Sequence, residues 1–253
     1  MEFRGRTLLT VLLLAPAVAS AQDIDWLFAP YGWLPAITLD QSGGDPGDGG
    51  GGGGGLSGNS LLDMTDSFFK FHAEVARNRW GVVLDYITLS LSDRTTLAAR
   101  PPLDLAIDLK AELDLDVIEL GGFYRPSGEL AGVSYLAGLR RISPDKTLFV
   151  TPSIGPAQRI DTATDVTDVF LGARYRHEFG RRWSAGIRGD YSFGDSEGTL
   201  NVLANVGFRF AGPAAFHAGY RHTVIEFDET VAGDEVTTRI ELSGPFVGLA
   251  FMF

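Results

Sequence analysis

The sequence contains no cysteine among its 253 residues. Such a chain has no disulfide framework and no thiolate site, so packing and hydrogen bonds must hold its fold. After the first twenty residues it also lacks any run of about 18 consecutive apolar residues, the length that a membrane-spanning helix needs. Basic residues are outnumbered, at 21 Lys and Arg against 32 Asp and Glu. The formal net charge of −11 argues against nucleic acid as a partner.

The first 21 residues read as a secretory signal peptide. Arg4 and Arg6 give a positive start, an apolar stretch runs over 8–18, and Ala19-Ser20-Ala21 forms an A-x-A cleavage site. Their removal deletes one acid and two bases, which takes the net charge to −12. Residues 22–253 remain, enough for one sizeable exported domain.

The dominant pattern in that domain is alternation with a period of two, and helical periodicity is scarce. The clearest case is IDLKAELDLDV at 107–117, where every second residue is apolar and the residues between are charged. Eleven such residues match the 9–11 that a tilted strand needs to cross a bilayer. We expect Ile107, Leu109, Ala111, Leu113, Leu115 and Val117 to face outward, and Asp108, Lys110, Glu112, Asp114 and Asp116 to face inward.

Counting the alternating segments predicts ten strands, with eight or twelve as the alternatives. They lie near 26–39, 67–77, 80–92, 105–124, 131–142, 166–179, 183–194, 198–210, 214–228 and 236–253. An even number places both termini at one end. The last strand contains Pro245, and the parity of its apolar residues changes near it, so we expect a β-bulge at Ser243–Pro245.

The expected connections are short on the side of the termini and mostly longer on the other side. The long ones fall at about 40–66, 93–104, 143–165 and 229–235, and the first contains a glycine-rich loop at about 41–58. This asymmetry is typical of bacterial outer-membrane barrels.

A soluble β-sandwich also alternates, so other features must decide between the two folds. Aromatic residues lie near the ends of the expected strands, as in the girdles of membrane barrels. A sheet in lipid must also close, because unpaired edge groups are costly there. The sequence therefore predicts an all-β, antiparallel, up-and-down transmembrane β-barrel over 22–253.

Several segments resemble a largely uncharacterised family of small Gram-negative outer-membrane β-barrel proteins. The most distinctive is WLFAPYGWLPAI at 26–37, with the pattern W-x-F-x-P-Y-x-W-x-P, and GPFVGLAFMF at 244–253 is another. The resemblance implies localisation in the cell outer membrane. It also implies that the C-terminal Phe253 acts as the signal read by the outer-membrane assembly machinery.

Inward-facing charges suggest two interpretations of the lumen. Acidic residues of the early strands facing basic residues of the later ones could form a narrow pore for small polar solutes, or they could pair and fill a ten-stranded barrel as a structural network. The candidates for the lumen or its constriction are His72, Glu74, Asp85, Asp114, Asp116, Arg140, Arg174, Arg176, Arg188, Arg209, Arg221 and Arg239.

Two alternative functions remain open at this stage. One is an outer-membrane enzyme acting on lipid or peptide, although no Ser–His–acid trio is visible from the spacing. The other is a surface-binding barrel that uses its acidic loops. We expect a monomer with no cofactor, no metal site and no catalytic residues, in contact with outer-membrane lipid and lipopolysaccharide.

Overall fold

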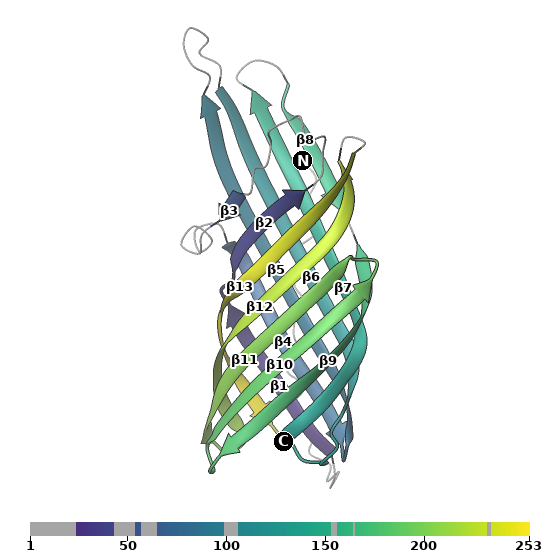
Figure 1. Cartoon of the computed structure of the whole chain (residues 1–253). Coiled ribbons are helices and arrows are strands. Elements are labelled where there is room, and N and C mark those ends of the chain that lie inside the picture. Colours follow the sequence, from purple (N-terminus) through teal and green to yellow (C-terminus); the bar gives the residue numbers. More distant parts are fainter. Residues whose placement is uncertain are drawn as a thin grey trace.

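The protein folds as one antiparallel β-sheet that closes on itself (Figure 1). The computed structural model describes residues 24–42, 54–56, 65–98, 106–152, 156–163, 165–231 and 234–253. The predicted signal peptide and most of the glycine-rich loop lie outside the described residues. The strands are β1 Ile24–Trp33, β2 Ala36–Ser42, β3 Gly54–Leu56, β4 Thr65–Arg77, β5 Trp80–Ala98, β6 Ala106–Tyr124, β7 Gly132–Pro152, β8 Gln158–Ala163, β9 Val166–Phe179, β10 Trp183–Gly194, β11 Gly198–Ala211, β12 Ala214–Val231 and β13 Asp234–Met252.

Two pairs of these strands lie end to end along one neighbouring strand, and β3 is only a short addition, so ten strands make up the wall of the barrel. Trp33 of β1 pairs with Phe246 of β13, and Ala36 of β2 pairs with Ser243, so the register is unchanged across the interruption at Leu34-Pro35. In the same way β8 and β9 pair with successive parts of β7. With β3 as a short addition beside β2, the predicted ten-stranded antiparallel barrel is confirmed.

The barrel is closed by pairing of the first strand with the last. Backbone hydrogen bonds of 2.9 and 3.0 Å join Trp26 and Phe253 in both directions, so the described chain begins beside its C-terminus, which lies at the lower end in Figure 1. The connections at this end are tight, and Asn78 occupies one of them with φ of 56°. Asparagine tolerates this left-handed conformation better than most residues. No helix long and apolar enough to cross a membrane occurs in the described residues.

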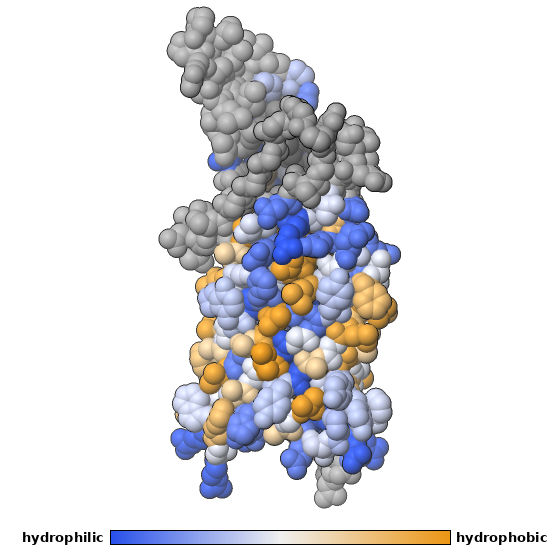
Figure 2. Space-filling view, viewed as in Figure 1, coloured by the Kyte–Doolittle hydropathy of each residue, from blue (hydrophilic) through white to orange (hydrophobic). Residues whose placement is uncertain are grey.

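An apolar belt surrounds the half of the barrel nearest the termini. Figure 2 shows apolar side chains across the middle of the viewed face, with more polar ones at the end that carries the termini. Aromatic pairs lie toward that end, with ring centroids 4.7 Å apart for Trp80–Tyr124 and for Trp183–Phe208. The exposed apolar residues include Trp80, Val82, Leu120, Val133, Tyr135, Leu139, Leu171, Ile187, Tyr191, Val206, Tyr220, Val247 and Leu249. An outward apolar band with aromatic girdles is the surface of a transmembrane barrel.

Above this belt the polarity of the two faces of the wall is reversed: the outer face is polar and the inner face is apolar. On β6 the exposed positions are Leu120 and Ile118 within the belt, followed by Asp116 and Asp114 above it. The buried positions of the same strand run from Glu119 to apolar residues at 117 and 115. The alternation keeps one phase, but the outer face becomes polar where the inner face becomes apolar. The outer surface of the upper wall is therefore suited to water.

The same exchange explains why the predicted bulge in β13 is wrong. The pairing of β12 with β13 runs without a register shift from Val231↔Asp234 to Ala214↔Phe251. Ile240, Leu242 and Phe246 all face inward, while Val247 and Leu249 face outward within the belt. The change of parity in the sequence marks the level at which the apolar residues of β13 change from the inner face to the outer face. It does not mark a bulge.

The upper strands are longer than predicted. β7 continues to Pro152 and β8 covers Gln158–Ala163, within the region expected to be a loop at 143–165. β5 likewise continues to Ala98, six residues beyond its predicted end. These extensions raise part of the wall above the rest of the barrel (Figure 1).

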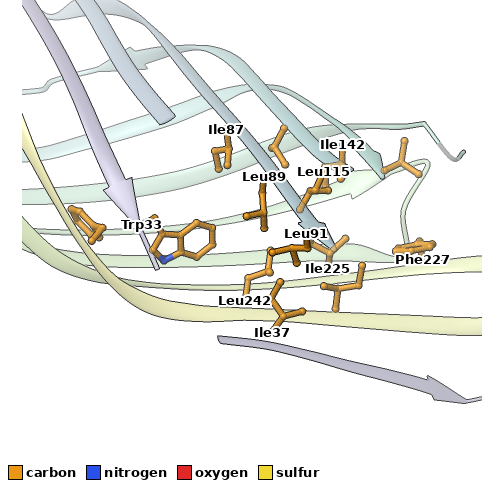
Figure 3. Packing of buried hydrophobic residues seen from close by; sticks show 14 residues of the cluster. Trp33, Ile37, Ile87, Leu89, Leu91, Leu115, Ile142, Ile225, Phe227 and Leu242 are labelled. Carbon is orange, nitrogen blue, oxygen red and sulfur yellow. The ribbon is translucent and has the colours of Figure 1, made fainter. Parts of the chain in front are cut away.

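The interior of the upper barrel is an apolar cluster contributed by strands from all around the wall. Figure 3 shows Trp33, Ile37, Leu89, Leu115 and Ile225 directed toward one another within the barrel. Trp33 is 2% exposed, and its indole Nε1 donates to the carbonyl oxygen of Gly244 at 3.1 Å. Burial of this many apolar side chains makes the upper interior a packed core.

Candidate functional site

Directly below the apolar cluster, a layer of buried charges crosses the middle of the barrel. Its centre is Glu119 of β6, which is 1% exposed. Arg140 Nε donates to Glu119 Oε1 at 3.0 Å, and Arg188 Nη2 donates to Oε2 at 2.8 Å. Arg221 Nη2 lies 3.6 Å from Oε1. One carboxylate is thus shared by arginines from β7, β10 and β12.

Asp190 is the second carboxylate of this layer. It accepts hydrogen bonds from Arg140, from Arg188 Nε at 2.7 Å and from Asn201 Nδ2 at 2.8 Å. Arg140 Nη1 also donates to Ser192 Oγ at 3.1 Å. An unpaired charge is costly to bury, so each ion here requires such partners.

A second group of charges links the early strands to β9. His72 Nδ1 lies 3.0 Å from Asp85 Oδ2, and its Nε2 lies 2.8 Å from Glu74 Oε1. Glu74 also accepts hydrogen bonds from both terminal nitrogens of Arg174, and the bond from Nη2 to Oε2 is 2.8 Å long. Lys70 Nζ, fully buried, lies 3.5 Å from Asp85 Oδ1. The Glu74–Arg174 pair joins strands on different sides of the wall, so these side chains span the lumen.

The cations of both groups also lie over aromatic rings. Lys70 Nζ is 4.5 Å from the centroid of Tyr31, and Arg140 Cζ is 5.4 Å from that of Phe170. Arg221 Cζ is 5.4 Å from the ring of Trp33, which belongs to the apolar cluster above. Cation–π contacts of desolvated charges are worth about 2 kcal/mol. They connect the charged layer to the apolar layer.

Between these two layers little space remains. A void of about 20 Å³ is lined by Trp33, Ile142, Arg140, Arg221 and their neighbours. A cavity of about 10–15 Å³ by this measure holds one water, so the void has room for about one water molecule and not for a chain of them.

Below the charged layer, toward the termini, the interior opens into a cavity of about 170 Å³. Its lining combines apolar and polar side chains: Leu27, Ala29, Tyr31, His72, Glu74, Asp85, Arg174, Arg176, Arg188, Leu203, Asn205, His217, Arg221 and Phe246 among them. Several polar groups from different strands converge on this one hollow, which makes it the candidate site for a ligand.

The structure places most of the predicted lumen residues inside the barrel. His72, Glu74, Asp85, Arg140, Arg174, Arg176, Arg188 and Arg221 face inward, and Arg209 lies at the rim nearest the termini. Glu119, Asp190 and Lys70 complete the charged layer. Whether any of these residues forms a constriction for solutes stays a prediction.

Three of the predicted lumen residues are on the outer face, and for them the prediction is wrong. Asp114 and Asp116 are exposed, and Asp116 accepts a hydrogen bond from Tyr86 Oη at 3.1 Å. Arg239 is exposed and pairs with Glu226. All three lie above the apolar belt, where charged side chains face water and the lumen is apolar.

A polar trio on the outer face was not found from the sequence. His222 of β12 is directly opposite Ser243 of β13, with Nδ1 and Oγ 2.5 Å apart. Glu241 Oε1 lies 3.6 Å from His222 Nδ1 and 3.5 Å from Ser243 Oγ. The trio lies next to the exposed apolar residue Tyr220 and to Pro245, at the edge of the belt. Only the strand register reveals it, because 21 residues separate His222 from Ser243.

Fold and interior together define a closed ten-stranded barrel of the transmembrane type. Neither a protein-family model nor a curated protein matches the sequence. Similar solved structures include the outer-membrane protease OmpT from Escherichia coli, at 9% identity over 92% of this chain and 97% of that chain, with a TM-score of 0.48. Another is the translocator domain of the autotransporter NalP from Neisseria meningitidis, at 9% identity over 93% and 90%, with a TM-score of 0.41.

The attachment invasion locus protein Ail of Yersinia pestis is also similar, at 11% identity over 88% of this chain and 98% of that chain, with a TM-score of 0.31. Similarities this low leave the activities of those proteins unassigned to this chain.

Proposed function

We propose that this protein is a non-conducting structural barrel of the outer membrane that holds an extended β-wall outside the cell. The observation that carries the proposal is the stacking of two filled layers in the lumen. Ionic side chains from β4, β5, β6, β7, β9, β10 and β12 meet at mid-height, and an apolar cluster lies directly above them.

The apolar belt supports placement in a membrane. Large apolar side chains are exposed on every side of the lower wall, including Trp80 at 68% and Leu120 at 55%. Such a contiguous surface is stable against lipid and promotes aggregation in water. The charged outer face of the upper wall would then contact lipopolysaccharide head groups and the medium, and the tight turns and both termini would face the periplasm.

Conductance in planar bilayers tests the closed lumen. We expect the refolded mature chain, inserted into a bilayer, to show no discrete current steps in concentrated potassium chloride. A sixteen-stranded porin measured in the same bilayers is the positive control. Steps that scale with salt concentration would show an open pore and overturn the proposal.

A second candidate function is ester hydrolysis at the outer leaflet, which the Ser243–His222–Glu241 trio favours. A serine hydrogen-bonded to a histidine is the core of nucleophilic hydrolases, although here Glu241 approaches the same ring nitrogen as Ser243, Nδ1, and not the opposite one. Ser243 Oγ would attack the ester carbonyl carbon while its proton passes to His222 Nδ1. The ester C–O bond would then break, the alcohol would take that proton, and water would hydrolyse the acyl-serine.

Release of fatty acid from phospholipid vesicles containing the protein tests this candidate. Activity lost in Ser243→Ala and in His222→Gln, but kept in Thr237→Ala farther along the same strand, would support it. Equal release by wild type and Ser243→Ala would exclude the trio as a catalytic site.

A further inference from the structure

The cavity below the charged layer contains hydrogen-bond donors that no protein group satisfies. His217 Nε2 and Arg176 Nε are both buried and both lack a hydrogen-bond partner among the described residues. Both side chains line the cavity. Leaving a buried donor unsatisfied costs about 1–3 kcal/mol, so two of them in one cavity indicate that something else accepts from them.

The partner of the other ring nitrogen determines what His217 offers. Asn205 Nδ2 lies 3.1 Å from His217 Nδ1. An amide N–H can only donate, so Nδ1 accepts and the proton of a neutral ring is on Nε2. His217 therefore presents an N–H group to the cavity.

Arg176 is the cation of the cavity that is least committed to protein anions. Its Nη2 lies 3.8 Å from Met252 Sδ and 3.6 Å from Glu178 Oε1 at the rim. In contrast, Arg174 binds Glu74 through both terminal nitrogens, and Arg188 binds Glu119 and Asp190. A guanidinium with free N–H groups is suited to a planar carboxylate.

The acids that line the cavity are already neutralised. Glu74 is held by Arg174 and His72, while Asp85 faces His72, Lys70 and, at 3.9 Å, Arg221. Each of these carboxylates thus has a cationic partner, although Asp85 Oδ1, 3.5 Å from Lys70 Nζ, accepts no hydrogen bond among the described residues. The charge at the lower end of the cavity is therefore positive.

Two glycines leave the space that the side chains of His217 and Asn205 occupy. A Cβ atom at Gly207 would lie 2.8 Å from His217 Cε1, and one at Gly186 would lie 2.6 Å from Asn205 Oδ1. Leu27, Leu203 and Phe246 add apolar walls. The volume of about 170 Å³ is close to that of an apolar protein cavity of about 150 Å³ that binds benzene, so a small organic molecule fits.

Access leads toward the rim that carries the termini. Arg176 and Ser184 line both the cavity and a smaller hollow next to it, which also includes the rim residues Arg182 and Arg209. Arginines along this route favour the approach of anions.

From these observations we propose that the cavity binds a small organic carboxylate that enters from the end carrying the termini. The carboxylate accepts from Arg176 Nε and His217 Nε2, and the short apolar part of the molecule contacts Leu27, Leu203 and Phe246. This binding does not require a through-pore and is independent of the proposed structural role.

Histidine-selective NMR of the mature chain in detergent micelles tests the proposal, with propionate as the probe. We expect propionate to shift the Nε2 resonance of His217 saturably and to leave that of His177, on the outer face, unchanged. Arg176→Gln removes one charge-assisted hydrogen bond and should weaken binding by at least about tenfold. Arg79→Gln, in the β4–β5 turn away from the cavity, is the matched control and should bind as wild type does.

A second variant keeps the test independent of the folding of Arg176→Gln. Ala29→Leu fills the cavity without removing a donor and should also abolish the saturable shift. The proposal is overturned if the His217 shift does not saturate, if Arg79→Gln weakens binding as much as Arg176→Gln, or if inorganic phosphate or chloride produces the shift at the same concentration as propionate.

Discussion

Arg188 of β10 donates across the barrel to Glu119 of β6, with Nη2 and Oε2 2.8 Å apart. Two strands, β7 and β9, separate these residues along the wall, so the bond passes through the lumen. Arg140 and Arg221 approach the same carboxylate. Glu119 therefore holds together three cations from different parts of the wall.

Replacing this carboxylate by an amide of the same shape tests its role. In Glu119→Gln, the three arginines lose their shared anion while remaining buried. Breaking a buried pair in this way costs about 3–5 kcal/mol of unfolding free energy. Urea unfolding in lipid vesicles measures the change, and Glu178→Gln at the exposed rim is the control, expected to be near wild type. Equal midpoints for the two variants would show that the layer contributes little stability.

The apolar cluster gives a second stability prediction. Leu115 is 3% exposed and faces the lumen, although its neighbours on the strand, Asp114 and Asp116, face outward. Leu115→Ala creates a cavity in a packed core and should lower the unfolding free energy by about 2–5 kcal/mol. Asp114→Ala, next to it on the outer face, should change it by less than about 0.5 kcal/mol. If the outward variant were the more damaging of the two, the assignment of the two faces would be reversed.

Alternation predicts the strands well, because every residue of a barrel wall faces either outward or inward. The segments predicted at 166–179 and 183–194 coincide with β9 and β10. Glu74 and Arg174 are also assigned correctly to the interior, since their strands lie within the apolar belt. Alternation alone does not predict at which residue a strand leaves the apolar belt, because the alternation continues unchanged above it.

Alternation therefore assigns Asp114 and Asp116 to the wrong face of β6. Assigning the apolar face to the outside holds only at the level of the belt, and above it the apolar face packs inside. The position of Glu119 could have indicated this level from the sequence. Glu119 has the same parity as Leu115 and Val117, so one face of β6 changes from apolar to charged along the strand. The contacts across the lumen depend on curvature and strand tilt, and so only the structure reveals the pairing of Glu74 with Arg174.

The C-terminal residue provides a prediction about assembly. Phe253 pairs through its backbone with Trp26, while its side chain is 61% exposed. Phe253→Ala preserves the backbone hydrogen bonds, so refolding in vitro should be close to wild type. If the side chain is the signal for the assembly machinery, the amount of protein in the outer membrane of cells should fall severalfold. Conservative Phe253→Tyr should restore it. Normal levels of Phe253→Ala in the outer membrane would remove this role.

Single cysteines on β6 measure directly the level at which the barrel wall leaves the lipid. The chain has no native cysteine, so Asp114, Asp116, Ile118 and Leu120 can each be replaced by cysteine and spin-labelled in lipid vesicles. All four share the outward face. We predict that labels at 118 and 120 are accessible to oxygen dissolved in lipid, whereas labels at 114 and 116 are accessible to a water-soluble nickel complex. Water accessibility at all four positions would show that this part of the wall does not lie in lipid.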